Sequence, residues 1–146
     1  MIDSDKCTHI GFYGIINNDD FLLVVRKSRG PYKGLFDLPG GRPQYGEPIL
    51  NALSREIKEE TGIEAKTYSL YDNFSFFIHY DDSAQKKKSM YHIALIYNVI
   101  QFDKHKFDPK IASEDVNGCI WVNKEKLSEE QCSPVLKSVL IACKKK

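Results

Sequence analysis

Three glutamates stand close together in the segment SREIKEETG, at positions 56, 59 and 60. On a helix, side chains at i, i+3 and i+4 are neighbours, so like charges at these positions repel. Glu59 and Glu60 would also occupy the last helical turn, where the helix dipole disfavours anions. A divalent cation would stabilise such a cluster, and carboxylate oxygens are the ligands that suit Mg²⁺ or Mn²⁺. The alternative is ion pairing with Arg55, Lys58 and bases elsewhere in the chain.

The helix that carries these glutamates is predicted from Pro48 to Thr61, with Gly62 at its C-terminal stop. Its apolar side chains form one stripe: Ile49, Leu50, Leu53 and Ile57. At about 100° per residue, Glu56 and Glu60 fall within about 20° of the start of that stripe, and Glu59 falls about 80° away. We therefore expect the carboxylates to turn inward, toward the packed side of the helix.

The rest of the chain alternates β-rich runs with turn-forming residues. The predicted elements are a hairpin of Ile10–Ile16 and Phe21–Arg26 around Asn17–Asp20, an extended piece at Phe36–Leu38, strands at Tyr68–Tyr80, Tyr91–Ile100 and Ile120–Val122, a hairpin loop at 81–89, and a helix at Pro134–Cys143. Strands followed by a helix, more strands and a second helix indicate a mixed sheet with helices packed on it, an α+β arrangement.

Composition indicates one ordinary globular domain over residues 1–146. The net charge of +1 gives no overall attraction to nucleic acid or anionic membranes, so neither is expected as a stable partner. No apolar run approaches the roughly 18 residues of a membrane span. The four cysteines form no CxxC pair, which favours reduced thiols in a cytoplasmic protein over a zinc or redox motif.

The residues around the acidic helix resemble the signature of the Nudix (MutT-like) hydrolases, G-x5-E-x7-R-E-U-x-E-E-x-G-U, in which U is bulky and aliphatic. Every specified position is matched without a gap, by Gly41, Glu47, Arg55, Glu56, Ile57, Glu59, Glu60, Gly62 and Ile63. The preceding LFDLPGG is also similar to the usual lead-in of that family. The resemblance implies the Nudix fold, an α/β/α sandwich with a central mixed β-sheet.

The resemblance also implies an activity, the Mg²⁺- or Mn²⁺-dependent cleavage of the pyrophosphate linkage in a nucleoside diphosphate derivative. Nucleoside triphosphates, dinucleoside polyphosphates and nucleotide sugars are the candidate substrates. By position, the catalytic set would be Glu47, Arg55, Glu56, Glu59 and Glu60. Of these, the last three would bind the metal together with the carbonyl of Gly40. Glu47 and Arg55 would support the site by pairing with each other. A homodimer is compatible with this assignment.

Several roles stay open at the level of sequence. The general base could be Glu56, or Glu114 from the loop SEDVNG, for which a solvated acidic turn is the alternative. Arg26 and Lys27 could contact phosphate or simply lie at the surface. Tyr80 is a candidate substrate contact because it follows the motif at a distance similar to that of a tyrosine in dinucleoside polyphosphate hydrolases.

Two other functions are compatible with a Nudix-like sequence. A non-catalytic module would bind a nucleotide as a regulator, and an eroded motif would favour it, whereas this motif is intact. An isomerase acting on isopentenyl diphosphate would need further catalytic cysteine and glutamate residues and a longer chain. The intact acidic motif therefore favours hydrolysis.

Overall fold

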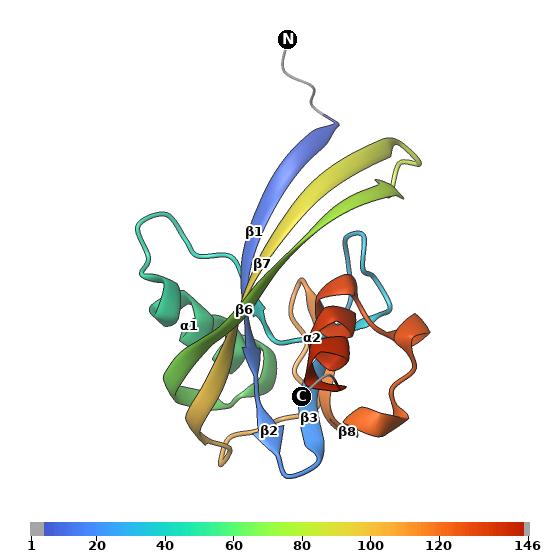
Figure 1. The fold of residues 1–146 in the computed structure, drawn as a ribbon. Coiled ribbons are helices and arrows are strands. Elements are labelled where there is room, and N and C mark those ends of the chain that lie inside the picture. Colours follow the sequence, from blue (N-terminus) through green and yellow to red (C-terminus); the bar gives the residue numbers. More distant parts are fainter. Residues whose placement is uncertain (1–4, 145–146) are drawn as a thin grey trace.

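The computed structural model describes residues 5–144, which form two four-stranded sheets flanked by two α-helices (Figure 1). The strands are β1 (Lys6–Ile15), β2 (Asn17–Asn18), β3 (Phe21–Lys27), β4 (Phe36–Asp37), β5 (Gly40–Gly41), β6 (Glu64–Asp81), β7 (Lys87–Asp103) and β8 (Val116–Asn123). The helices are α1 (Ile49–Thr61), α2 (Pro134–Lys144) and the short 3-10 turns η1 (Lys124–Lys126) and η2 (Glu129–Gln131). Neither α-helix is long and apolar enough to cross a bilayer.

The first sheet is mixed and the second is antiparallel. The first has the order β5-β1-β7-β6, in which β1 runs parallel to β7 and antiparallel to β5, and β6 is antiparallel to β7. In the second, β3 pairs with β2, β4 and β8. Helices α1 and α2 lie on opposite flanks of the strands (Figure 1). This arrangement confirms the predicted α+β class.

The predicted hairpin at the start of the chain is wrong in its pairing. Strand β1 pairs with β5 and β7, and only the two-residue β2 forms a hairpin with β3. The chain passes from one sheet to the other at Ile16, which is fully buried between them. Residues 22–25 of β3 are all buried, because both faces of that strand are covered. A continuous apolar run of this kind does not reveal which strand is its partner.

Strands β6 and β7 are longer than predicted at both ends. They pair from Glu64↔Asp103 to Asp81↔Lys87, so the connecting turn shrinks to residues 82–86. With β1 they form a curved arm that extends beyond the helices (Figure 1). Backbone pairing carries the arm through the largely polar residues 81 and 87–89, a composition that is typical of a loop.

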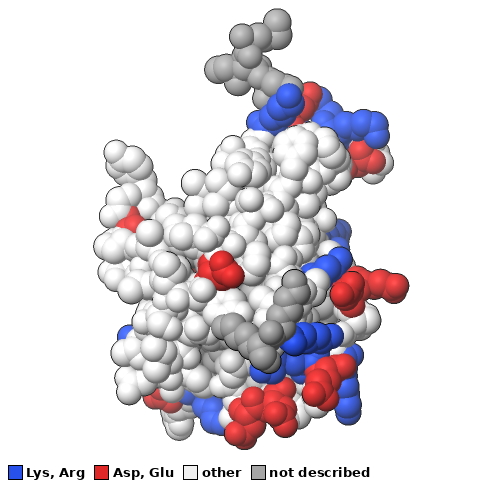
Figure 2. Space-filling model, viewed as in Figure 1, with Lys and Arg blue, Asp and Glu red and all other residues white. Residues whose placement is uncertain are grey.

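Charged side chains gather at the tip of this arm and along the opposite end of the molecule in the face shown, while the surface between is largely uncharged (Figure 2). At the tip, Lys86 and Lys88 lie 3.6 and 3.5 Å from Asp5, and Lys87 lies 3.6 Å from Asp81. The lysine run is therefore partly neutralised by nearby carboxylates, and pairs this exposed contribute little to stability.

Helix α1 has the bounds that the sequence predicts. Pro48 precedes its first turn, and Gly62 ends it in the left-handed conformation with φ of 79°. A side chain at Gly62 would place its Cβ 2.0 Å from the carbonyl oxygen of Lys106, so only glycine fits. The predicted stripe is wrong in its first turn, where Ile49 and Leu50 are 40% and 43% exposed.

The buried face of α1 begins only where the helix meets the sheets. It consists of Ala52, Leu53, Ile57, Glu60 and Thr61. Leu53 and Ile57 pack into a cluster with Ile16, Val25 and Val99. This packing fixes the rotation of the helix, and one carboxylate, that of Glu60, lies on the packed side.

Helix α2 also matches its predicted position and is tied to the second sheet. The Oγ of Ser133 donates a hydrogen bond of 2.7 Å to Oδ1 of Asp37 and accepts one of 3.2 Å from the backbone N–H of Leu136. Val135 and Val139 are buried in a second core cluster, which includes Tyr13. The helix start is thereby anchored to β4.

The four cysteines are free thiols, as predicted. Cys119 and Cys132 are buried, and Cys7 and Cys143 are exposed. Burial raises the pKa of Cys119 to about 11, so this thiol stays protonated at neutral pH.

Candidate active site

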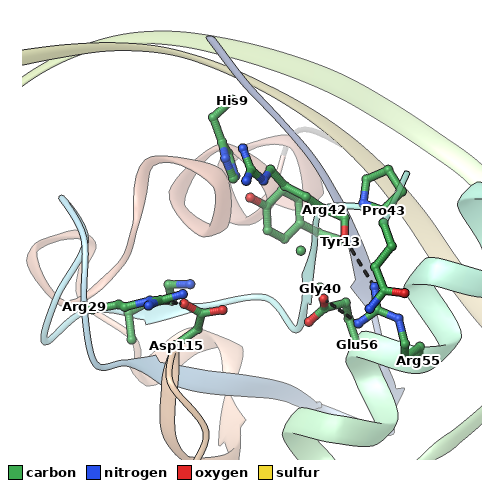
Figure 3. A pocket seen from close by; sticks show the side chains of 12 residues that line it. His9, Tyr13, Arg29, Gly40, Arg42, Pro43, Arg55, Glu56 and Asp115 are labelled. Carbon is green, nitrogen blue, oxygen red and sulfur yellow. Dashed lines mark hydrogen bonds and ion pairs between the residues drawn. The ribbon is translucent and has the colours of Figure 1, made fainter. Parts of the chain in front are cut away.

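A cleft of about 520 Å³ opens between the middle of α1 with the loop before it and the loops that follow β3 and precede β8 (Figure 3). Glu56 and Arg55 lie on one side of it, and Arg29 and Asp115 lie on the other (Figure 3). His9 and Arg42 approach from a third side. Acidic and basic groups therefore face one open space.

The floor of the cleft is the Gly40–Gly41 backbone of β5. Gly40 pairs with Tyr13 of β1 at a φ of 151°, and a Cβ there would lie 2.1 Å from the carbonyl oxygen of Phe12. A Cβ on Gly41 would lie 2.9 Å from the carboxyl carbon of Glu56. The two glycines thus let this backbone pass between β1 and the acidic helix.

Glu60 is the most deeply buried acid of the motif, with 3% of the residue exposed. Its Oε1 accepts a hydrogen bond of 2.8 Å from the backbone N–H of Gly40. Burial raises the pKa of Glu60 well above its ordinary value, and the hydrogen bond from Gly40 opposes this shift only in part. Among residues 5–144 no lysine or arginine forms an ion pair with Glu60. A buried carboxylate without a cation is costly.

The other two acids of the motif contact Arg55. Glu56 lines the cleft, and its Oε1 lies 2.9 Å from Nη1 of Arg55. Burial raises the pKa of Glu56 although Arg55 opposes the shift. Glu59 lies 3.3 Å from the same Nη1, with 54% of its side chain exposed. The expectation that all three acids turn inward is wrong for Glu59, because its position lies about 120° from Leu53 and about 160° from Ile57, the two helix residues that pack into the core.

Glu47 and Arg55 form the pair that the family resemblance implies. Nε and Nη2 of Arg55 lie 2.9 and 2.8 Å from the two carboxylate oxygens of Glu47. The backbone N–H of Gln44 donates to Glu47 as well, at 3.0 Å. Arg55 lowers the pKa of Glu47 to about 2. This two-bonded contact holds the 42–47 loop against the helix.

The donor atoms fit a hard divalent cation, although they do not converge into a closed cluster. Within the described residues no three His, Cys, Asp or Glu side chains meet in a metal-binding group. Arg55 occupies the space between Glu56 and Glu59, and Glu60 turns to Gly40. The adjoining oxygen donors are the carboxylates of Glu56 and Glu60 and the backbone of Gly40, a set that suits Mg²⁺ or Mn²⁺.

Two basic side chains of the cleft, Lys27 and Arg42, form no ion pair within residues 5–144. Arg29 is paired, with Asp115 through its Nε and with Glu114 at 3.5 Å. Arg42 stands at an unspecified position inside the motif, so no pattern of residues singled it out. Unpaired cations in a cleft are available to an anionic ligand.

The three weaker substrate candidates lie outside this cleft. Arg26 points to the opposite face of β3, where its guanidinium lies 4.5 Å from the centre of the Phe36 ring. The neighbouring Lys27 faces the cleft, because successive side chains of a strand alternate. Glu114 is 86% exposed, and its neighbour Asp115 lines the cleft instead.

Tyr80, the third of these candidates, lines a separate cavity of about 530 Å³ beside the arm. Arg29 borders that cavity as well as the cleft. The tyrosine is thus a neighbour of the cleft and does not line it.

Comparison with known proteins places this geometry in context. A family model described as NUDIX domain matches residues 7–141. An ADP-ribose pyrophosphatase of Methanocaldococcus jannaschii is 45% identical over 62 residues, which are 42% of this chain and 37% of that protein. The human 8-oxo-dGDP phosphatase NUDT18 is 34% identical over 55 residues, 38% of this chain and 17% of that protein. The chain therefore spans well under half the length of these relatives.

Solved structures show the same fold at low sequence identity. The crystal structure of a MutT NUDIX hydrolase from Burkholderia pseudomallei aligns with a TM-score of 0.71 and 22% identity, over 92% of this chain and 97% of that one. A MutT protein from Bacillus halodurans aligns with a TM-score of 0.67 and 22% identity, over 91% of this chain and 80% of that one.

Proposed function

Because the chain belongs to the Nudix hydrolase family, we propose that it cleaves the pyrophosphate linkage of a nucleoside diphosphate derivative with the help of Mg²⁺ or Mn²⁺. The observation that carries the proposal is the division of charge in the cleft. Cleft-lining Glu56 provides anionic oxygens on one side, and buried Glu60 lies behind it against the backbone of Gly40. Lys27 and Arg42, which form no ion pair within residues 5–144, provide cations for a polyphosphate on another.

The basic residues bind and orient the substrate in this proposal. A diphosphate brought close to Glu56 and Glu60 would be repelled unless positive charge lay between them. Lys27 and Arg42 supply part of that charge. Glu56, Glu60 and the backbone of Gly40 would hold a divalent ion, which would supply the rest of the charge and would make the attacking water more acidic. The planar guanidinium of Arg42 suits paired phosphate oxygens.

Glu56 is the proposed general base. It lines the cleft, and burial raises its pKa, which makes it a better proton acceptor than an exposed glutamate. Glu114 is less suited because its exposed side chain lies outside the cleft. Asp115 is the second candidate, since it faces the cleft from the side opposite Glu56 (Figure 3).

Arg55 and Glu47 are proposed as positioning residues. Their two hydrogen bonds fix the loop that carries Arg42, and Nη2 of Arg55 also donates to the carbonyl oxygen of Arg42 at 3.4 Å. The same guanidinium holds the carboxylate of Glu56. The side chain of Arg55 thereby positions Glu56, on the anionic side of the cleft, relative to Arg42 on the cationic side.

The substrate class is proposed from the relatives and from the cleft together. ADP-ribose and 8-oxo-dGDP appear in the names of two relatives, and both contain a diphosphate joined to a nucleoside. Nucleoside triphosphates, dinucleoside polyphosphates and nucleotide sugars share that unit. A small-molecule nucleotide of this kind is the expected partner.

The test is a panel of these compounds assayed with Mg²⁺ and with Mn²⁺ and scored by product. Wild-type protein should release a nucleoside monophosphate or pyrophosphate only when metal is present. Glu60→Gln and Glu56→Gln should lose turnover. Glu64→Gln, a change at a partly exposed residue just beyond the helix, is the matched control and should keep it. Metal-independent turnover, or full turnover in both cleft variants, would contradict the proposal.

A further inference from the structure

A smaller cavity of about 210 Å³ adjoins the cleft and extends beneath the loop after β3. It shares Lys27, Arg29 and Asp115 with the cleft, so one ligand can occupy both spaces. Its deeper walls include the largely apolar side chains of Tyr32 and Met90. On the basis of the proposed function, we infer that this cavity receives the base of the nucleotide, and that Asp37 selects a guanine-type base through one free carboxylate oxygen.

The hydrogen bonds of Asp37 leave one of its oxygens available. Oδ1 accepts from the backbone N–H of Leu38 at 2.8 Å and from Oγ of Ser133 at 2.7 Å, whereas Oδ2 has no hydrogen-bond partner among the described residues. Only 2% of the residue is exposed. No fully buried side-chain oxygen in residues 5–144 lacks a partner, so Oδ2 is not fully buried, and Asp37 is one of the residues that line the cavity.

The cavity also holds a hydroxyl hydrogen that can be donated. His92 lies between two tyrosines, with Nε2 at 2.9 Å from the Tyr13 hydroxyl and Nδ1 at 2.7 Å from the Tyr32 hydroxyl. Burial lowers the pKa of His92 to about 4, so the ring is neutral at pH 7 and carries one N–H. One tyrosine therefore accepts from the ring and keeps its own hydrogen, whichever tautomer is present.

These groups match the edge of guanine. That edge presents two adjacent donors, N1–H and the N2 amine, beside the O6 acceptor. Oδ2 of Asp37 has two lone pairs for the donors, and a tyrosine hydroxyl can donate to O6. Adenine offers a single exocyclic amine beside an unprotonated ring nitrogen, so it satisfies fewer of these groups. Reading a base by its edge while aromatic and apolar side chains contact its faces is a common arrangement in enzymes that bind nucleobases.

Asp37→Asn is the informative substitution. The amide oxygen can keep both bonds that Oδ1 makes, while the NH₂ group replaces the free acceptor with a donor. The probes are GDP, IDP and ADP, titrated by calorimetry without metal. Wild-type protein should bind GDP most tightly and IDP, which lacks the N2 amine, more weakly. Asp37→Asn should weaken GDP binding about 10- to 100-fold and leave ADP within about twofold, because a hydrogen bond to a charged group is lost.

The matched control is Ser133→Ala, which removes a hydrogen bond to Oδ1 and leaves Oδ2 untouched. It should lower the melting temperature without changing the ratio of GDP to ADP affinity. Equal losses for GDP and ADP in Asp37→Asn would overturn the inference, as would unchanged GDP binding or a wild-type preference for ADP. If GDP binds selectively and no compound of the panel is hydrolysed, the base site stands and the proposed hydrolase function fails.

Discussion

The substitution Glu60→Gln tests whether the buried carboxylate of Glu60 serves to bind metal or to stabilise the fold. The amide oxygen can still accept the hydrogen bond from Gly40 that measures 2.8 Å in the wild type. The substitution removes a carboxylate that is 3% exposed and forms no ion pair within residues 5–144, and the charge of Lys27 offsets its burial only in part. We therefore expect the metal-free variant to be at least as stable as the wild type, because an uncompensated buried charge is removed.

When Mg²⁺ is added, the wild type should become more stable than the Glu60→Gln variant. An ion that binds only the folded protein, at 100 times its dissociation constant, stabilises by about 2.7 kcal/mol. For a domain of this size that corresponds to a rise in melting temperature of roughly 5–11 °C. Wild-type protein should show this rise on titration with Mg²⁺, and Glu60→Gln should lose most of it.

The assay is thermal unfolding followed by circular dichroism, in EDTA and over a series of Mg²⁺ concentrations. Glu64→Gln controls for the loss of one negative charge near the same helix. A Glu60→Gln variant that melts far below the wild type in EDTA would show that the carboxylate is stabilised by the protein itself. An undiminished Mg²⁺ response in that variant would exclude Glu60 as a ligand.

Three further outcomes are expected. Glu47→Gln should lower kcat/KM about 10- to 100-fold with little change in melting temperature, because it weakens, without abolishing, a partly buried two-bonded contact that positions the cleft; equal activity to the wild type would contradict the positioning role. Gly62→Ala should lower the free energy of unfolding in urea by more than about 1 kcal/mol, since φ is 79° and the new Cβ would meet a carbonyl oxygen at 2.0 Å. Burial lowers the pKa of both His9 and His92 to about 4, so unfolding takes up protons between pH 6.5 and 4 and stability falls as pH falls through that window. The pKa of Asp37 is raised to about 6, so this residue makes the folded protein more stable as pH falls from 6 to 3.8. Asp37→Asn removes that opposing contribution, and the free energy of unfolding in urea should therefore fall more from pH 7 to pH 5 in the variant than in the wild type.

The parts of the fold that could be predicted from sequence are those set by local interactions. Helix α1 and its end at Gly62 follow from backbone preferences of proline and glycine and from the periodicity between them. The start of α2 at Pro134 follows in the same way. Strand pairing did not follow, because the runs of β1 and β3 are equally compatible with a hairpin and with the observed placement in two different sheets.

For the site, the periodicity of the chain identified the acidic helix, and the resemblance to the Nudix signature implied the Glu47–Arg55 pair. Tertiary packing decided which acid is buried and which is not, since the rotation of α1 is fixed by the cluster around Leu53 and Ile57. The same packing brought Asp37 beside a cavity through contacts with Ser133, 96 residues away in sequence. Contacts between such distant residues depend on how the sheets and helices pack, and no local pattern records them.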